Sequence, residues 1–146
     1  MYDRILVATD GSEHALAAAR EALGLAETHD AIVYALYVVE TSTSWLAVSK
    51  NEVTDALRDV GIDAGKTALA DVESLAADRD VDLVTELGEG SADEEILAYA
   101  AEIDADLAVM GTHGREGVRR RLVGSVAERV VRDAPMPVLT VNAQDA

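Results

Sequence analysis

The chain has 146 residues, contains no cysteine, and carries a formal net charge of −16 from 28 acidic and 12 basic residues. Without cysteine, disulfides, thiolate nucleophiles and cysteine-ligated zinc sites are excluded. A chain this acidic is not expected to bind nucleic acid, and its length fits a single domain over residues 1–146.

The elements are predicted from apolar periodicity in chain order. Residues 5–8 form a short β-branched run that predicts a buried strand. The following Asp10-Gly11-Ser12 predicts a turn whose serine caps a helix, and apolar residues at helical spacing extend that helix to Ala26. Residues 31–39 predict a second strand, and residues 40–50, which show no clear period, predict a loop.

The second half of the chain continues the alternation. A long helix is predicted from Asn51 to Leu75, where Gly61 and Gly65 cost about 1 kcal/mol each relative to alanine and are candidates for a bend. The next predicted elements are a strand over residues 81–87, a turn with a helix cap over residues 88–91 and a helix over residues 92–100. They are followed by a strand over residues 106–110, a glycine-punctuated segment over residues 111–124, a helix over residues 125–132 and a last strand over residues 137–141. Alternating strands and helices predict a doubly wound α/β fold with a parallel sheet and right-handed crossovers.

In such sheets ligands bind beyond the carboxyl ends of the strands, where the strand order reverses, so the residues after strands one and four are the candidates. Gly111 and Gly114 follow strand four, and Gly124 and Ser125 stand at the start of a helix. Glycines allow a ligand close to the backbone, and a helix N-terminus attracts anions, so together they predict a phosphate cradle. The alternative is that Gly111 and Gly114 are turn glycines and Ser125 is an ordinary N-cap.

Six of the ten arginines lie within residues 115–132 of this acidic chain, which suggests a bound anion. Arg115 and Arg119 are the candidates for direct phosphate contact, and a docking patch is the alternative. Asp10, before Gly-Ser, is either a ligand group or a turn residue. His113 is interpreted as a residue that lines the ligand site, since no serine or aspartate is placed by the sequence to form a catalytic relay with it.

The segment from Asp104 to Val141, with Gly111, Gly114, Gly124 and Ser125, resembles the carboxyl-terminal signature of ATP-binding universal stress proteins, Gly-x2-Gly-x9-Gly-(Ser/Thr). The opening RILVATDGS and the middle VYALYVVE resemble the first two strands of that family, so the resemblance covers essentially the whole chain.

The resemblance implies a five-stranded parallel sheet in the order 3-2-1-4-5 and a homodimer through the last strand. It implies that ATP with Mg²⁺ is bound by Asp10, by the backbone of Val38 (with Val39 as the next candidate), and by the phosphate-binding Gly111, Gly114, Gly124 and Ser125. The implied function is a nucleotide-responsive stress or signalling module with little or no turnover. A slow ATPase or nucleotidyl-transfer enzyme, and an assembly protein that has lost its ligand, are the alternatives.

A second glycine motif, residues 61–67, resembles a Walker A loop but has the spacing Gly-x3-Gly rather than Gly-x4-Gly, and it lies inside a helical period. We therefore expect no phosphate site there.

The charged opening predicts no signal peptide, and no run approaches the roughly 18 apolar residues of a membrane span, so a soluble cytoplasmic protein without a membrane partner is expected. The chain has only two lysines, and this scarcity together with the acidity resembles proteins of salt-accumulating organisms. An ordinary solvated acidic surface is the alternative.

Overall fold

The computed structural model describes residues 2–41, 52–113 and 124–143. Their elements in chain order are β1 (Arg4–Ala8), α1 (Glu13–His29), β2 (Ile32–Glu40), α3 (Glu52–Ala76), β3 (Asp82–Gly90), α4 (Ala92–Glu102), β4 (Leu107–Gly111), α5 (Ser125–Asp133) and β5 (Val138–Val141). All strand pairs are parallel and the sheet order is β3-β2-β1-β4-β5. The predicted doubly wound fold and its strand order are confirmed.

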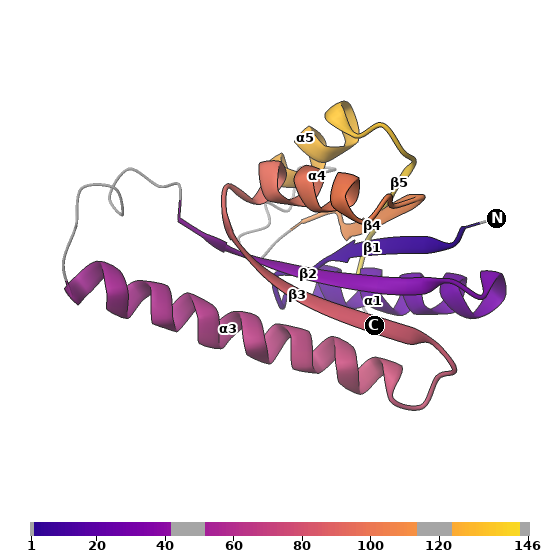
Figure 1. Ribbon diagram of the computed structural model, residues 1–146, viewed down its shortest axis with the longest axis horizontal. Coiled ribbons are helices and arrows are strands. Elements are labelled where there is room, and N and C mark those ends of the chain that lie inside the picture. Colours follow the sequence, from indigo (N-terminus) through magenta and orange to yellow (C-terminus); the bar gives the residue numbers. More distant parts are fainter. Residues whose placement is uncertain (1, 42–51, 114–123, 144–146) are drawn as a thin grey trace.

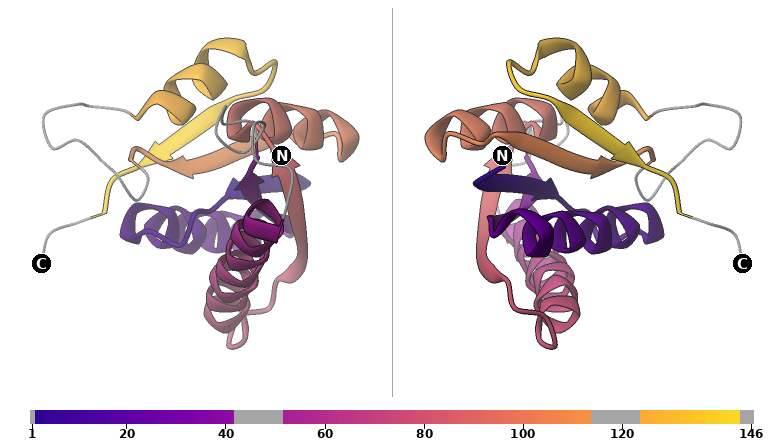
Figure 2. Two further views of the ribbon diagram at one scale, coloured as in Figure 1. Left: turned by 90° about the vertical axis from the view of Figure 1, so that its left-hand side faces the viewer. Right: turned by 90° about the vertical axis from the view of Figure 1, so that its right-hand side faces the viewer.

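Helices cover both faces of the sheet, with α1 and α3 on one face and α4 and α5 on the other (Figures 1 and 2). Neighbouring residues of β1 supply both cores, because successive side chains of a strand point to opposite faces. Ile5 and Val7 belong to the core beneath α1 and α3, whereas Leu6 belongs to the core beneath α4 and α5. The apolar runs of the sequence thus reflect strands that are buried on both faces.

Helix α1 begins as its sequence predicts. Ser12 is the N-cap, and its hydroxyl accepts a hydrogen bond from the Ala15 N–H at 3.2 Å. The helix ends at Asp30, which takes the left-handed conformation with φ 56°, and the Asp30 N–H donates to the Ala26 carbonyl. The N-cap at Ser12 fixes the segment between β1 and α1, which lies at the carboxyl end of the sheet.

The predicted turn over residues 88–91 is wrong in its first three residues, because β3 continues through Gly90. Gly88 and Gly90 pair with Val38 and Glu40 of β2, so the ladder of the longer neighbouring strand overrides the weak strand preference of glycine. Ser91 does occupy the N-cap of α4, but its hydroxyl bonds to the Asp93 carboxylate at 2.8 Å instead of capping a backbone N–H.

The long helix α3 runs without interruption through Gly61 and Gly65, so the Walker-like motif lies within a helix, as expected. The predicted loop over residues 40–50 starts later than expected, since Glu40 still belongs to β2 and pairs with Gly90 of β3. Residues 42–51 lie outside the described part of the chain.

Candidate functional site

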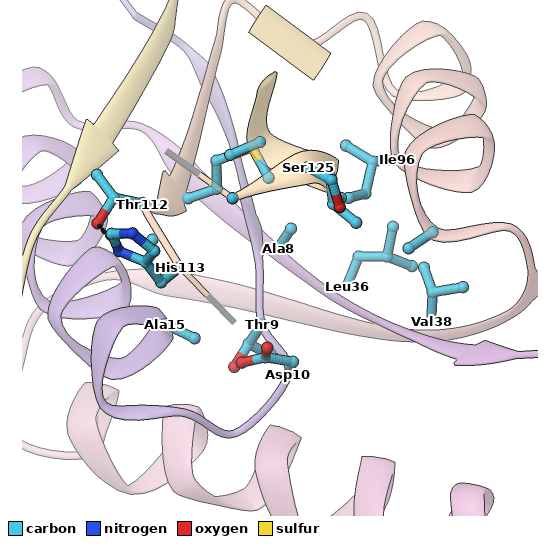
Figure 3. Close-up of a pocket in the computed structure, with 16 residues that line it drawn as sticks. Ala8, Thr9, Asp10, Ala15, Leu36, Val38, Ile96, Thr112, His113 and Ser125 are labelled. Carbon is cyan, nitrogen blue, oxygen red and sulfur yellow. Dashed lines mark hydrogen bonds between the residues drawn. The ribbon is translucent and has the colours of Figure 1, made fainter. Parts of the chain in front are cut away.

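A pocket of about 360 Å³ opens beyond the carboxyl ends of β1, β2 and β4, where the strand order reverses (Figure 3). Its described lining comes from the ends of these strands and from the first turns of α1, α4 and α5. The lining residues are Ala8, Thr9, Asp10, Ala15, Leu36, Val38, Ala92, Ile96, Met110, Gly111, Thr112, His113, Gly124, Ser125, Val126 and Ala127.

The segment after β1 holds Asp10 at the pocket by a chain of short-range hydrogen bonds. The Asp10 carboxylate accepts from the Ser12 N–H at 2.9 Å, and the Thr9 hydroxyl accepts from the Gly11 N–H at 3.1 Å. Gly11 has a φ of 83°, which glycine adopts without strain. Asp10 is therefore both a turn residue and a lining residue, so the two interpretations of its sequence position are compatible.

The end of β4 approaches helix α1 very closely at Gly111. A Cβ atom built on Gly111 would stand 2.7 Å from the backbone carbonyl carbon of His14. The absence of a side chain at Gly111 is thus needed for packing against α1, whatever binds in the pocket. The sequence predicted either a ligand role or a turn role for Gly111, and the packing role against α1 was missed.

Helix α5 points its N-terminus into the pocket. Its N-cap is Gly124, with φ −71° and ψ 165°, which offers no side chain to the first N–H groups of the helix. Ser125 is the first helical residue, so its interpretation as an N-cap is wrong by one position. The Gly124 N–H donates to the carbonyl of Thr112, which joins the start of α5 to the end of β4. The uncapped positive end of a helix is suited to an anionic group.

The first turn of α4 also reaches the pocket, but acidic groups already compensate its positive end. Glu40 accepts the Ala92 N–H at 3.2 Å, and the first turn contains Asp93, Glu94 and Glu95. The hydrogen bond from the Ser91 hydroxyl, with a smaller contribution from Arg129, holds the pKa of Asp93 below its usual value. Between the two helix ends, the start of α5 is therefore the better place for an anion.

One wall of the pocket is apolar and is formed by residues such as Leu36, Val38 and Ile96 (Figure 3). Val38 lines the pocket, whereas the side chain of Val39 lies on the opposite face of the sheet, in the core beneath α1 and α3. A pocket with an apolar wall, one carboxylate and a positive helix end can hold a small ligand that has both a flat apolar part and an anionic part.

Five of the seven predicted site residues line this one pocket: Asp10, Val38, Gly111, Gly124 and Ser125. Gly114 and Arg115 lie outside the described residues, as does Arg119. Thr9 and Thr112 were missed, although Thr9 directly follows the predicted strand of residues 5–8 and Thr112 lies two residues beyond that of residues 106–110, which was the available signal. Ile96 and Met110 carry no such signal, because their sequence contexts are those of ordinary core residues.

The described residues include no cluster of three or more histidine, aspartate or glutamate side chains that could hold a metal ion. Within the same part of the chain, no helix is long and apolar enough to cross a membrane.

The sequence model of the universal stress protein family matches residues 1–142 of this chain. A universal stress protein of Methanocaldococcus jannaschii is 40% identical over 142 residues, which are 97% of this chain and 83% of that protein. The structure of the universal stress protein UspA from Lactobacillus plantarum superposes with a TM-score of 0.84 at 34% identity, covering 96% of this chain and 97% of that one.

A more distant structure shares the fold and holds a ligand. It is a universal stress protein in complex with cAMP, with a TM-score of 0.71 at 24% identity, covering 98% of this chain and 99% of that one.

Proposed function

This chain belongs to the universal stress protein family, and on that premise we propose that it binds an adenine nucleotide, ATP with Mg²⁺, in the pocket between Asp10 and α5. The observation that carries the proposal is the N-terminus of α5, which opens into the pocket with a glycine as its N-cap. A phosphate chain placed there would accept hydrogen bonds from the first N–H groups of α5, to which the glycine N-cap offers no side chain.

The rest of the pocket fits the nucleoside. The apolar wall formed by Leu36, Val38 and Ile96 suits an aromatic base, and the Asp10 carboxylate suits a ribose hydroxyl or an amino group as donor. Gly114 and Arg115 complete the proposed phosphate site by their place in the glycine motif. Mg²⁺ would be held by the phosphates and by water, since this ion usually binds proteins through few side-chain ligands.

Binding without fast turnover is the proposed activity. Asp10 and His113 are the ionisable side chains among the described residues that line the pocket. Rapid phosphoryl transfer needs a group that positions the nucleophile in addition to charges on the phosphates. We propose that the nucleotide acts as a bound effector of a cytoplasmic homodimer assembled through β5, and that hydrolysis is slow or absent.

The test is the ATP-dependent stability of the folded chain, measured by thermal unfolding in high salt. At a hundredfold excess over the dissociation constant, MgATP should stabilise the native state by about 2.7 kcal/mol, a rise in Tm of roughly 5–10 °C. Gly124→Val should abolish this rise and leave the fold intact, because the backbone angles of Gly124 are ones that valine adopts. The unliganded Tm should fall only modestly, since valine is a poorer N-cap than glycine. Ser125→Ala should weaken it, by about 1–2 kcal/mol for one hydrogen bond to a charged group.

Lys66→Ala is the matched control, since Lys66 belongs to the Walker-like motif and is exposed on α3. A wild type with no ATP-dependent rise contradicts the proposal. A rise lost in Lys66→Ala and kept in Gly124→Val would place the phosphates elsewhere. Mass spectrometry of nucleotide released from denatured protein would separate ATP from ADP and AMP.

A further inference from the structure

The segment that follows β5 makes two hydrogen bonds to segments that line the pocket. The Asn142 Oδ1 accepts from the Thr112 hydroxyl at 2.5 Å, and the Ala143 N–H donates to the Nδ1 of His14 at 3.0 Å. Thr112 directly follows β4, and His14 stands in the first turn of α1. Residues 142–143, which we call the β5 link, therefore join the end of β4 to the start of α1.

Thr112 is held at three of its polar groups. It is 4% exposed and lines the pocket (Figure 3). Its N–H donates to the Val141 carbonyl at 3.0 Å, its hydroxyl donates to Asn142, and its carbonyl accepts the N–H of Gly124. The first two bonds hold Thr112 to β5 and the β5 link, and the third holds the N-cap of α5. A continuous path of hydrogen bonds thus runs from Asn142 through Thr112 to the start of α5.

The Thr112 hydroxyl has no proton left for a ligand. A hydroxyl has one proton to donate, and a carboxamide oxygen can only accept, so this proton lies in the bond to Asn142. Phosphate oxygens are hydrogen-bond acceptors and gain no donor from this side chain. Asn142 is not among the described residues that line the pocket. Both side chains can therefore act on a bound phosphate only through the groups that they position.

The bond between Thr112 and Asn142 lies beyond the last paired residues of the two strands. The register pairs of β4 and β5 end at Gly111 with Val141, so the ladder joins these strands without it. The bond lies instead where the chain leaves β4 toward the segment that precedes α5. A small change there would redirect the Thr112 carbonyl and the N-cap that it holds.

We propose that Thr112 and Asn142 are positioning residues of the nucleotide site, and that the β5 link thereby regulates the affinity of the pocket for phosphate. This inference rests on the proposed nucleotide binding at α5. Hydrogen bonds weaken steeply when donor and acceptor are misaligned. The N–H groups at the start of α5 therefore bind an anion well while the link holds Thr112, and less well when its bond to Asn142 opens.

The first experiment measures hydrogen exchange of the Gly124 amide by NMR, without ligand and in high salt. Asn142→Ala and Thr112→Val should each speed this exchange by about three- to tenfold, the worth of one hydrogen bond. Thr112→Ser keeps the hydroxyl and should restore the slow exchange. Thr112→Val also removes the 3.1 Å contact of the hydroxyl with Nδ1 of His113, which Asn142→Ala leaves in place. Agreement between the two variants therefore identifies the bond to Asn142.

The second experiment measures the dissociation constant of MgATP by isothermal titration, well below the Tm of each variant. Asn142→Ala and Thr112→Val should each weaken binding by about three- to tenfold. The double variant should be no weaker than the weaker single variant, because both substitutions remove the same bond. Thr112→Ser should bind close to wild type.

Thr28→Val is the matched control for both experiments. The Thr28 hydroxyl donates to the Gly24 carbonyl at 3.2 Å in the last turns of α1, away from the pocket. This variant makes the same chemical change as Thr112→Val and loses one hydroxyl hydrogen bond. It should keep the Gly124 exchange rate and the MgATP affinity of wild type.

Unchanged Gly124 exchange in Asn142→Ala and Thr112→Val would overturn the inference, whether or not the chain binds a nucleotide. Equal MgATP affinity in wild type and Asn142→Ala, or additive losses in the double variant, would also overturn it and leave the proposed function intact. A wild type that binds no MgATP would overturn the proposed function and the regulation with it, even if the Gly124 exchange changes as expected.

Discussion

Gly65 lies in the middle of α3 at a place where a side chain would collide with the sheet. A Cβ atom built there would be 2.5 Å from the Cδ1 of Leu87 and 2.7 Å from the Cδ1 of Tyr37. One turn earlier, a Cβ on Gly61 would be 2.8 Å from the Cγ1 of Val39. The two glycines share one face of the helix because they are four residues apart, and together they let α3 lie close against β2 and β3.

Gly65→Ala is therefore expected to destabilise the fold by about 1–3 kcal/mol, as overpacking does in a core, despite the higher helix propensity of alanine. Gly24→Ala in α1 is the matched control, because its Cβ would make an ordinary contact of 3.7 Å with Arg79. That change should stabilise the protein by about 0.5–1 kcal/mol. Urea unfolding at high salt measures the free energy of unfolding of both variants. A Gly65→Ala variant that is more stable than wild type would contradict the packing argument.

At the scale of elements, the two edges of the sheet differ in charge. Edge strand β3 has nine residues and exposes Asp82, Glu86 and Glu89. Edge strand β5 has four residues, Val138–Val141, and none is charged. Charged side chains on an edge discourage pairing with another chain, whereas an uncharged apolar edge is usually covered or paired. In a chain of net charge −16, two acidic β3 edges would also repel each other.

The homodimer is accordingly predicted to form through β5. Leu139 is 36% exposed on that strand, and Leu139→Asp should convert the dimer to a monomer at micromolar protein. Val84→Asp is the matched control, since Val84 is 42% exposed on the opposite edge strand, and its dimer should persist. Light scattering in high salt measures the oligomeric state of the wild type and of both variants. A monomeric wild type would refute the dimer, and a dimer that survives Leu139→Asp would refute the interface.

At the scale of the whole molecule, negative charge is opposed by few cations. The five ion pairs found among the described residues all involve arginines at least 32% exposed, and pairs of this kind contribute little stability. Repulsion among the excess carboxylates therefore acts against the compact state at low ionic strength. Salt weakens that repulsion, because the Debye length falls from about 10 Å at 0.1 M to about 3 Å at 1 M.

The hypothesis of adaptation to a salty interior predicts that the Tm rises substantially between 0.05 M and molar KCl. Sucrose at equal osmolality is the control, because it strengthens apolar burial without screening charge. A Tm that does not change across the KCl series, or a rise that sucrose reproduces, would favour the ordinary acidic surface instead.

The strand order of the sheet and the place of Val38 in the site were implied by the family resemblance. The sequence by itself determined the order of the elements, the doubly wound parallel fold and the two segments, after strands one and four, that gather at the pocket. These follow from local features: apolar runs for buried strands, the Asp-Gly-Ser turn after β1, and the glycine motif after β4. The local pattern predicted too early an end for β3. The backbone hydrogen bonds that extend this strand to Gly90 come from β2, which lies some fifty residues away in the chain.

Only the tertiary structure decided which valine of β2 lines the pocket. The segment from Ile32 to Glu40 is apolar on both faces, so its pattern does not distinguish Val38 from Val39. The tertiary structure also decided the hydrogen bonds that Thr112 donates to Asn142 and that His14 accepts from Ala143. His14 and Ala143 are 129 residues apart, and Thr112 and Asn142 are 30 apart. Contacts at such separations arise from the packing of the sheet and its helices, which no local period encodes.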